Sequence, residues 1–333
     1  MFESALDGTS QRKIGLYSRS LQNIERSLQT TGQHFVLAES YNRLAGILEV
    51  TFVKLMFARG VGGYQLLRDT VPTFLQLVFT ESTLWPDPTN FVSVSLAHVL
   101  GSSNYELSRF ILLDALHSMV YGLPQVIEYD TSTPPAPSGV WPCEWVHGCP
   151  IQLQFALVDI NKHCNSRIQV GPELDWRPIE HRIKSWQPTV QALSGNDSWK
   201  TIATMVVQES WRHSLLIYLY MGVCGARSDD ERVQASVQQV FQLVSSVDYF
   251  PTPSLAAHFL AQYLMAGAFA RSEKQRDKAH EKLTGAFQSG VWLIRGADFV
   301  PVLDHLWHGA AVNGQPIRWS DYVRSRQTML PVS

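Results

Sequence analysis

The feature that most constrains the fold is a helical stretch at residues 104–121, whose apolar positions recur so often that little of it can face water. Gly122 is placed to end this helix, and Pro124 prevents it from restarting. Residues 126–130 then read as extended chain. Because a helix that is apolar on most sides must be covered by other elements, this stretch predicts a large core built around it.

The rest of the chain predicts more helices. Segments of about ten to twenty-five residues carry helical periodicity, and short turns join them. We find no run with the period-two alternation of strands and no fixed-period repeat. We therefore predict an all-α fold, a single large multi-helical domain arranged as an irregular helical array and not as a strict repeat solenoid. Besides the central one, the predicted helices cover residues 10–30, 34–59, 64–79, 90–100, 150–163, 175–190, 199–224, 255–270, 271–287, 298–308 and 319–324, with a further helix beginning after a Ser228–Glu231 capping box.

The expected domain organisation is an N-terminal helix or extension at residues 1–32 and a main domain at residues 33–333. Residues 10–30 carry four cations and a single aromatic residue, Tyr17, among them, so we interpret them as a solvated helix face rather than a nucleic-acid arm. Residues 131–149 contain several prolines, which predicts an irregular loop.

Charge and cysteine content narrow the class of protein. The chain has 27 basic and 29 acidic residues, a formal net charge of −2, so it has no general attraction for nucleic acid or anionic membranes. No signal peptide is visible, and the longest apolar region, residues 44–57, is too short and too charged to span a bilayer. We expect no membrane association, and reduced cysteines in an intracellular compartment.

The central stretch also carries a recognisable order of motifs. It contains Tyr105–Glu106–Leu107, then Phe110 with Asp114, then Gly122–Leu123–Pro124 and Tyr129–Asp130. Further along the chain come EWVHGCP at 144–150, WRHSLLIYLY at 211–220, Ala266–Gly267 followed by Arg276, and FVPVLDHLW at 299–307. In order and spacing these motifs resemble the fungal-specific transcription factor domain, the helical regulatory region of fungal zinc binuclear cluster regulators. The resemblance runs from about residue 33 to the C-terminus.

The resemblance implies a non-enzymatic transcriptional regulator in the nucleus. Its expected partners are proteins of the transcription machinery or a DNA-binding regulator, together with a small-molecule effector. The zinc cluster that binds DNA in this family needs six closely spaced cysteines, and this sequence has four in all. We therefore expect no direct DNA binding by this chain alone. It is either a partner-dependent regulator or a fragment of a longer protein, and a cysteine cluster encoded upstream of Met1 would decide between them.

One group of cysteine and histidine residues could be considered as ligands of a zinc ion. Cys143, His147 and Cys149 lie close together, with His163–Cys164 further on. Structural zinc sites use cysteine pairs separated by two to four residues, whereas five residues separate Cys143 from Cys149. Buried thiols in a packed loop are the favoured interpretation, and we expect neither a metal site nor a cofactor.

Catalytic patterns are weak. Glu209 with His213, and Asp304 with His305 and His308, are the notable acid–histidine groups, and neither has zinc-protease spacing. We predict no catalytic residues. The alternative that stays open is an α-helical small-molecule-binding protein or enzyme with a site between its helices.

Asp114 is the strongest candidate for a structural or regulatory role, because it is the acid on the apolar face of the central helix. A buried carboxylate needs hydrogen-bond donors or takes up a proton. The sequence offers two sources of donors, Arg212 or the backbone amides of the Gly122–Pro124 turn. We favour a network that fixes how the helix meets its exit, with Tyr129 and Asp130 as further candidates, over a catalytic or ligand-binding acid.

Overall fold

Helix α6 (Tyr105–Tyr121) forms where the sequence predicts it. In the computed structural model, every residue from Phe110 to Tyr121 is buried. The helix ends at Gly122, whose φ of +60° is the left-handed conformation that glycine adopts readily. A Cβ added at Gly122 would lie 2.7 Å from Val323 Cγ2, so close packing also favours glycine there.

The structure describes residues 23–24, 26, 37–57, 62–85, 93–135, 141–166, 175–188, 198–247, 253–285 and 294–332. Over these residues helices dominate and the predicted all-α class is confirmed. The helices are α3 (Leu37–Phe57), α4 (Gly62–Thr80), α5 (Leu96–Leu100), α6, α7 (Pro142–His147), α8 (Ile151–Ser166), α9 (Arg177–Ser185), α10 (Ser198–Tyr218), α11 (Glu231–Ser246), α12 (Leu260–Ala268), α13 (Glu273–Gly285), α14 (Gly296–His308) and α15 (Trp319–Met329). A π-helical turn, Leu219–Val223, continues α10.

The described residues form two compact units, and the division falls within α6, between Asp114 and Ala115. The first unit contains α3, α4, α5, the first part of α6 and a short parallel pair of strands, β1 (Val94–Ser95) and β2 (Tyr129–Asp130). Its core includes stacked rings of Phe74 and Phe110, with centroids 4.2 Å apart. The predicted helix at residues 90–100 is therefore wrong over 94–95, where β1 pairs with the chain leaving α6.

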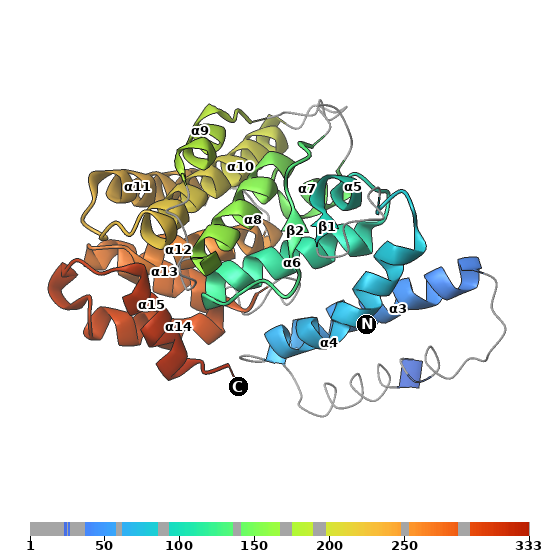
Figure 1. Cartoon of the computed structure of the whole chain (residues 1–333). Coiled ribbons are helices and arrows are strands. Elements are labelled where there is room, and N and C mark those ends of the chain that lie inside the picture. The colour runs from blue at the N-terminus through green and yellow to red at the C-terminus, as the bar shows by residue number, and fades with distance from the viewer. Residues whose placement is uncertain are drawn as a thin grey trace. The chain divides into compact units, whose positions relative to one another are not determined.

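The second unit contains the rest of α6 and the helices from α7 to α15. Helix α10 packs against α8, α11 and α12, and α14 packs against α15 (Figure 1). Almost all of α10 between Val206 and Tyr218 is buried or half-buried. This agrees with its sequence, which is apolar on most sides.

Two local predictions for the second unit are wrong. Helix α7 lies inside the stretch predicted as an irregular loop, because Pro142 is accepted in its first turn and Gly148 ends it at a φ of +66°. The cap of α11 is Asp230, whose side chain accepts a hydrogen bond from the Arg232 amide. Ser228 instead exchanges hydrogen bonds with the backbone of Ile317.

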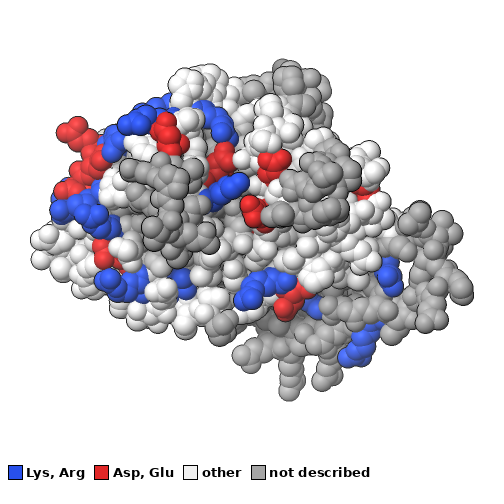
Figure 2. Space-filling model, viewed as in Figure 1, with Lys and Arg blue, Asp and Glu red and all other residues white. Residues whose placement is uncertain are grey.

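Among the described residues, no helix is both long and apolar enough to cross a membrane. Most of residues 1–32 lie outside the described part of the chain, so the predicted boundary at residue 33 stays a prediction. Acidic and basic side chains are interspersed on the face shown in Figure 2. Ion pairs among the described residues include Arg182–Asp159 and Arg232–Asp230.

Candidate functional site

The carboxylate of Asp114 lies in the part of α6 that belongs to the first unit, and it connects the helix by hydrogen bonds to the segment that follows it. Its side chain is fully buried. Oδ1 accepts a hydrogen bond from the Val126 amide at 2.8 Å. Oδ2 accepts one from the Ile127 amide at 3.3 Å and one from the Tyr129 hydroxyl at 2.9 Å. Both oxygens are thus satisfied by a segment that begins only a few residues beyond the end of the helix.

Burial controls the ionisation of this group. It raises the pKa of Asp114 to about 7, although the hydrogen bonds from Val126, Tyr129 and Ile127 act in the opposite direction. Burial, followed by the charge of Asp114, raises the pKa of the Tyr129 phenol well above its usual value. The phenol therefore keeps its proton at neutral pH and remains a donor.

The path of the chain between helix and strand explains why these donors meet Asp114. The Leu123 amide donates to the Ser118 carbonyl, and the Ser118 hydroxyl donates to the Leu123 carbonyl, which closes the turn. The chain then runs along β1, where the Val94 amide donates to the Glu128 carbonyl at 2.9 Å. The turn and the strand pairing hold residues 126–129 beside the helix they have just left.

The four candidate residues do not form one site. Tyr129 is buried against Asp114, whereas Asp130 is half-buried and accepts hydrogen bonds from the Ser132 amide and hydroxyl, as expected for neighbours on opposite faces of a strand. Arg212 pairs with Glu209 at 2.7 Å, one turn earlier on α10. The expectation that Arg212 donates to Asp114 is therefore wrong. The other expected source of donors, backbone amides after the helix, agrees better with the structure, but these amides belong to Val126 and Ile127 rather than to the Gly122–Pro124 turn.

The second unit holds the remaining part of α6 by polar contacts that the sequence motifs do not predict. Asn161 of α8 donates to the Ala115 carbonyl at 2.9 Å and accepts a hydrogen bond from the Tyr218 hydroxyl at 2.8 Å. The Tyr322 hydroxyl of α15 donates to the Val120 carbonyl, which lies in the last turn of α6 and lacks a helical partner. The sequence feature that could have indicated these contacts is Asn161, a polar residue within the otherwise apolar stretch of α8.

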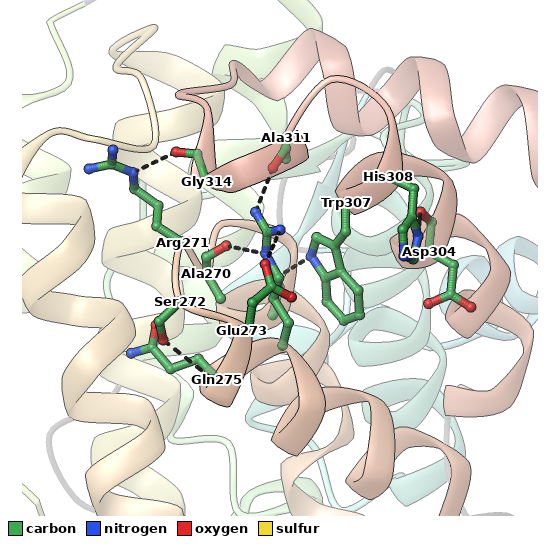
Figure 3. Close-up of polar contacts among 12 residues, drawn as sticks. Ala270, Arg271, Ser272, Glu273, Gln275, Asp304, Trp307, His308, Ala311 and Gly314 are labelled. Atoms are coloured by element: carbon green, nitrogen blue, oxygen red, sulfur yellow. Dashed lines mark hydrogen bonds and ion pairs between the residues drawn. The ribbon is translucent and has the colours of Figure 1, made fainter.

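A second polar centre explains the Gly267 and Arg276 motif (Figure 3). The guanidinium of Arg276, 3% exposed, donates to the carbonyls of Ala270 and Ala311 at 3.1 and 2.8 Å and pairs with Glu273 at 3.0 Å. Trp307 Nε1 donates to the Gly267 carbonyl at 3.0 Å. These groups join the end of α12, the start of α13 and the end of α14, so the motif serves packing.

The EWVHGCP motif also has a structural explanation. Glu144 Oε2 accepts a hydrogen bond from the Ile151 amide at 3.1 Å and so satisfies an amide at the start of α8. A Cβ at Gly148 would lie 2.6 Å from Val207 Cγ1, so this turn packs closely on α10. Cys143, Cys149, Cys164 and Cys224 form no disulfide bond, and burial raises the pKa of Cys149 well above its usual value. In the part of the chain that the structure describes, no three His, Cys, Asp or Glu side chains are grouped to hold a metal ion.

The acid–histidine groups do not assemble into a catalytic arrangement. Glu209 is engaged by Arg212, and burial, with the nearby Arg212 charge, lowers the pKa of His213 to about 4. His308 Nδ1 contacts the backbone carbonyl of Asp304, while His305 contacts the Ser325 hydroxyl at 3.0 Å. Figure 3 shows Asp304 and His308 beside the Trp307 centre. These contacts connect helices or lie within one helix, and neither group places a base beside an exposed nucleophile.

The family model of the fungal specific transcription factor domain matches residues 102–331, which include α6 and every described element after it. No curated protein and no solved structure matches the chain.

Proposed function

The chain belongs to the fungal-specific transcription factor domain family, and from this premise we propose that it is a non-enzymatic transcriptional regulator that acts in the nucleus. The observation that carries the proposal is the extent of the match, residues 102–331, which runs through α6 and on to α15. Asp114, Glu144, Gly267 and Arg276, all in motifs that resemble the family, are engaged in packing and helix capping. A set of residues with these roles supports a regulatory scaffold more than a catalytic site.

We further propose that the chain reaches DNA through a protein partner, either a DNA-binding regulator or a component of the transcription machinery. Its four cysteines do not supply the six ligands of a binuclear zinc cluster. Ion pairs such as Arg182–Asp159 and Lys184–Glu180 neutralise cations that would otherwise attract phosphates. Affinity for promoters then depends on the partner rather than on this chain.

A second candidate function is binding of a small-molecule effector between helices. It is favoured by a specific observation: Gln262 Oε1 and Nε2, Trp211 Nε1 and Ser214 Oγ, all on buried side chains of the second unit, have no hydrogen-bond partner. Such a ligand would act on the regulator by stabilising one arrangement of the helices that contain these side chains.

The experiment for the main proposal follows the protein in the organism that encodes it. A tagged full-length chain is expected in the nucleus and, after cross-linking, at a limited set of promoters. A variant with a disrupted core, Phe110→Asp, serves as the control and is expected to lose promoter occupancy. A tagged wild-type chain that is excluded from the nucleus under all growth conditions tested would refute the proposal.

A further inference from the structure

The chain leaves β2 through a short segment that carries hydroxyl groups beside two prolines. Ser132, Thr133 and Pro134 of this segment are exposed, and all of them belong to the first unit. The segment follows closely on Tyr129, which is 2% exposed and donates a hydrogen bond to Asp114 at 2.9 Å. Exposed hydroxyl groups therefore lie only a few residues beyond a contact that is fixed in the core.

Asp130 fixes the path of this segment, and its hydrogen bonds distinguish the two exposed hydroxyl groups. Its carboxylate accepts a hydrogen bond from the Ser132 amide at 2.9 Å and another from the Ser132 hydroxyl at 3.0 Å. These two bonds form a turn directly after β2, hereafter the Asp130 turn. Within the described part of the chain, the Thr133 hydroxyl makes no hydrogen bond. Of the two neighbouring hydroxyl groups, the one on Thr133 is therefore available to react.

Two prolines restrict the backbone on the C-terminal side of Thr133. Pro134 disfavours the helical conformation for the residue before it. Neither Pro134 nor Pro135 has an amide hydrogen, so neither can donate to a strand ladder or to a helix. The structure agrees, because residues 133–135 belong to neither a helix nor a strand. Thr133 thus lies on exposed chain whose conformational freedom is already reduced, which lowers the entropy lost when an enzyme binds it.

The missing amide hydrogen of Pro134 also indicates which class of enzyme this segment fits. Some protein kinases enclose the residue after the target hydroxyl in a pocket that offers no acceptor for its amide. Proline fits such a pocket, whereas any other residue would bury an unsatisfied N–H and bind roughly tenfold or more weakly. The sequence contains two Ser/Thr–Pro pairs, Thr133–Pro134 and Thr252–Pro253, and Thr252 lies outside the described residues.

We propose that Thr133 is phosphorylated by a proline-directed serine/threonine kinase, and that the phosphate weakens the Asp130 turn. In the reaction, the Thr133 oxygen forms a bond to the γ-phosphorus of ATP, and the bond from that phosphorus to the β–γ bridging oxygen breaks. ADP leaves, and the hydroxyl proton passes to a carboxylate base of the kinase. The inference goes beyond the proposed function and does not depend on it, because it concerns covalent modification of one exposed segment.

The charges around Thr133 determine the effect of the phosphate. It adds about −1.5 to −2 charges at pH 7, directly after the residue that Asp130 binds. Residues 126–135 include two acids, Glu128 and Asp130, and no Lys, Arg or His. The phosphate therefore meets like charge within its own segment. This repulsion opposes the hydrogen bonds from Ser132 to Asp130 and so loosens the chain where it leaves β2.

The first arm of the test incubates the purified full chain with MgATP and a mitogen-activated protein kinase as the probe, and maps the phosphate by mass spectrometry. Thr133 should be phosphorylated in the wild type and in Thr252→Ala, the matched control. Pro134→Ala keeps the target hydroxyl but should reduce phosphorylation of Thr133 by about tenfold or more. No phosphate on Thr133 of the wild type, or equal phosphorylation of Pro134→Ala, overturns the site.

The second arm compares the melting of the phosphorylated and unmodified chains. Phosphate on Thr133 should lower Tm by about 1 °C or more at low salt, and the difference should shrink at high salt because ions screen the repulsion. Asp130→Asn removes one of the like charges, so phosphorylation should lower the Tm of this variant by less. Equal Tm with and without phosphate, or a shift that Asp130→Asn leaves unchanged, overturns the effect on the Asp130 turn.

Discussion

At the scale of single residues, Asp114 shows how a buried acid is accommodated without a cation. Its oxygens are satisfied by two amides and a phenol from a segment that starts five residues after α6. The helix therefore cannot separate from its exit without leaving a carboxylate unpaired. This makes Asp114 a positioning residue for the β2 segment.

Loss of this carboxylate should be measurable. Asp114→Ala leaves the Val126 and Ile127 amides and the Tyr129 hydroxyl without their acceptor, so unfolding free energy should fall by roughly 1–3 kcal/mol. Asp114→Asn keeps one acceptor oxygen and, since no donor is cationic, should cost less. Chemical denaturation of the three proteins in parallel checks the order. If Asp114→Ala is as stable as the wild type but loses a ligand-induced shift, the acid belongs to a binding site instead.

The raised pKa of Asp114 predicts a pH dependence of defined sign. Since the folded-state pKa, about 7, exceeds the unfolded value of 3.8, the contribution of this group to stability is fully present below pH 4 and is lost as pH rises to 7. The slope cannot exceed about 1.4 kcal/mol per pH unit. We expect the difference in unfolding free energy between wild type and Asp114→Asn to decrease from pH 4 to 7 and then level off. A difference that increases over this range contradicts the assignment.

The burial of Asp114 was predictable, but its partners were not. The periodicity of α6 places the acid on a buried stripe, and that conclusion needs only the sequence. The donors depend on backbone angles after Pro124 and on pairing with β1, which is far away in the sequence. Arg212 was a poor candidate because Glu209, three residues before it on the same helix, offers a closer partner.

At the scale of elements, periodicity identified the long helices, including α6, α10 and α14, to within a few residues. It failed for short elements. Helix α7 spans six residues, too few to show a period, although a proline in its first turn and a glycine at its end were visible signals. Strand β1 has two residues and exists only because β2 lies beside it.

Helix packing at the Gly267 motif provides a prediction at this scale. A Cβ at Gly267 would lie 2.7 Å from Ala279 Cβ, where α12 packs against α13, so Gly267→Ala should lower unfolding free energy by about 1–3 kcal/mol. Gly285, at the end of α13, has nothing within 4 Å of the corresponding position. Gly285→Ala, the matched control, should leave stability unchanged or raise it slightly. Equal effects of the two substitutions, measured by thermal melting, would contradict this account of the motif.

A further prediction concerns zinc binding by the segment that contains α7. Glu144 caps α8 and Gly148 packs on Val207, which explains the motif without a metal ion. We expect elemental analysis of the purified chain to find no stoichiometric zinc. About one zinc per chain, lost in a Cys143→Ala variant, would show that Cys143 and its neighbours form a metal site.

At the scale of the whole molecule, the all-α class follows from the sequence because helical periodicity recurs and strand periodicity does not. The division of the described residues into two units within α6 could not be predicted from the sequence, because that division depends on which residues are in contact in the folded chain.

We expect no sequence-selective DNA binding by this chain alone, in keeping with its net charge of −2. Fluorescence polarisation with promoter fragments at physiological salt tests this, and a Kd in the nanomolar range for one sequence over others would contradict it.

The central claim, that this chain is a regulator of transcription, is tested most directly by tethering. The full chain is fused to an unrelated DNA-binding domain, and transcription of a reporter carrying that domain's operator is measured in fungal cells. If the chain regulates transcription, reporter transcription should change several-fold relative to the DNA-binding domain alone, and the core variant Phe110→Asp should lose that change. Reporter transcription that equals the DNA-binding domain alone, with the fusion folded and bound to its operator, would contradict the claim.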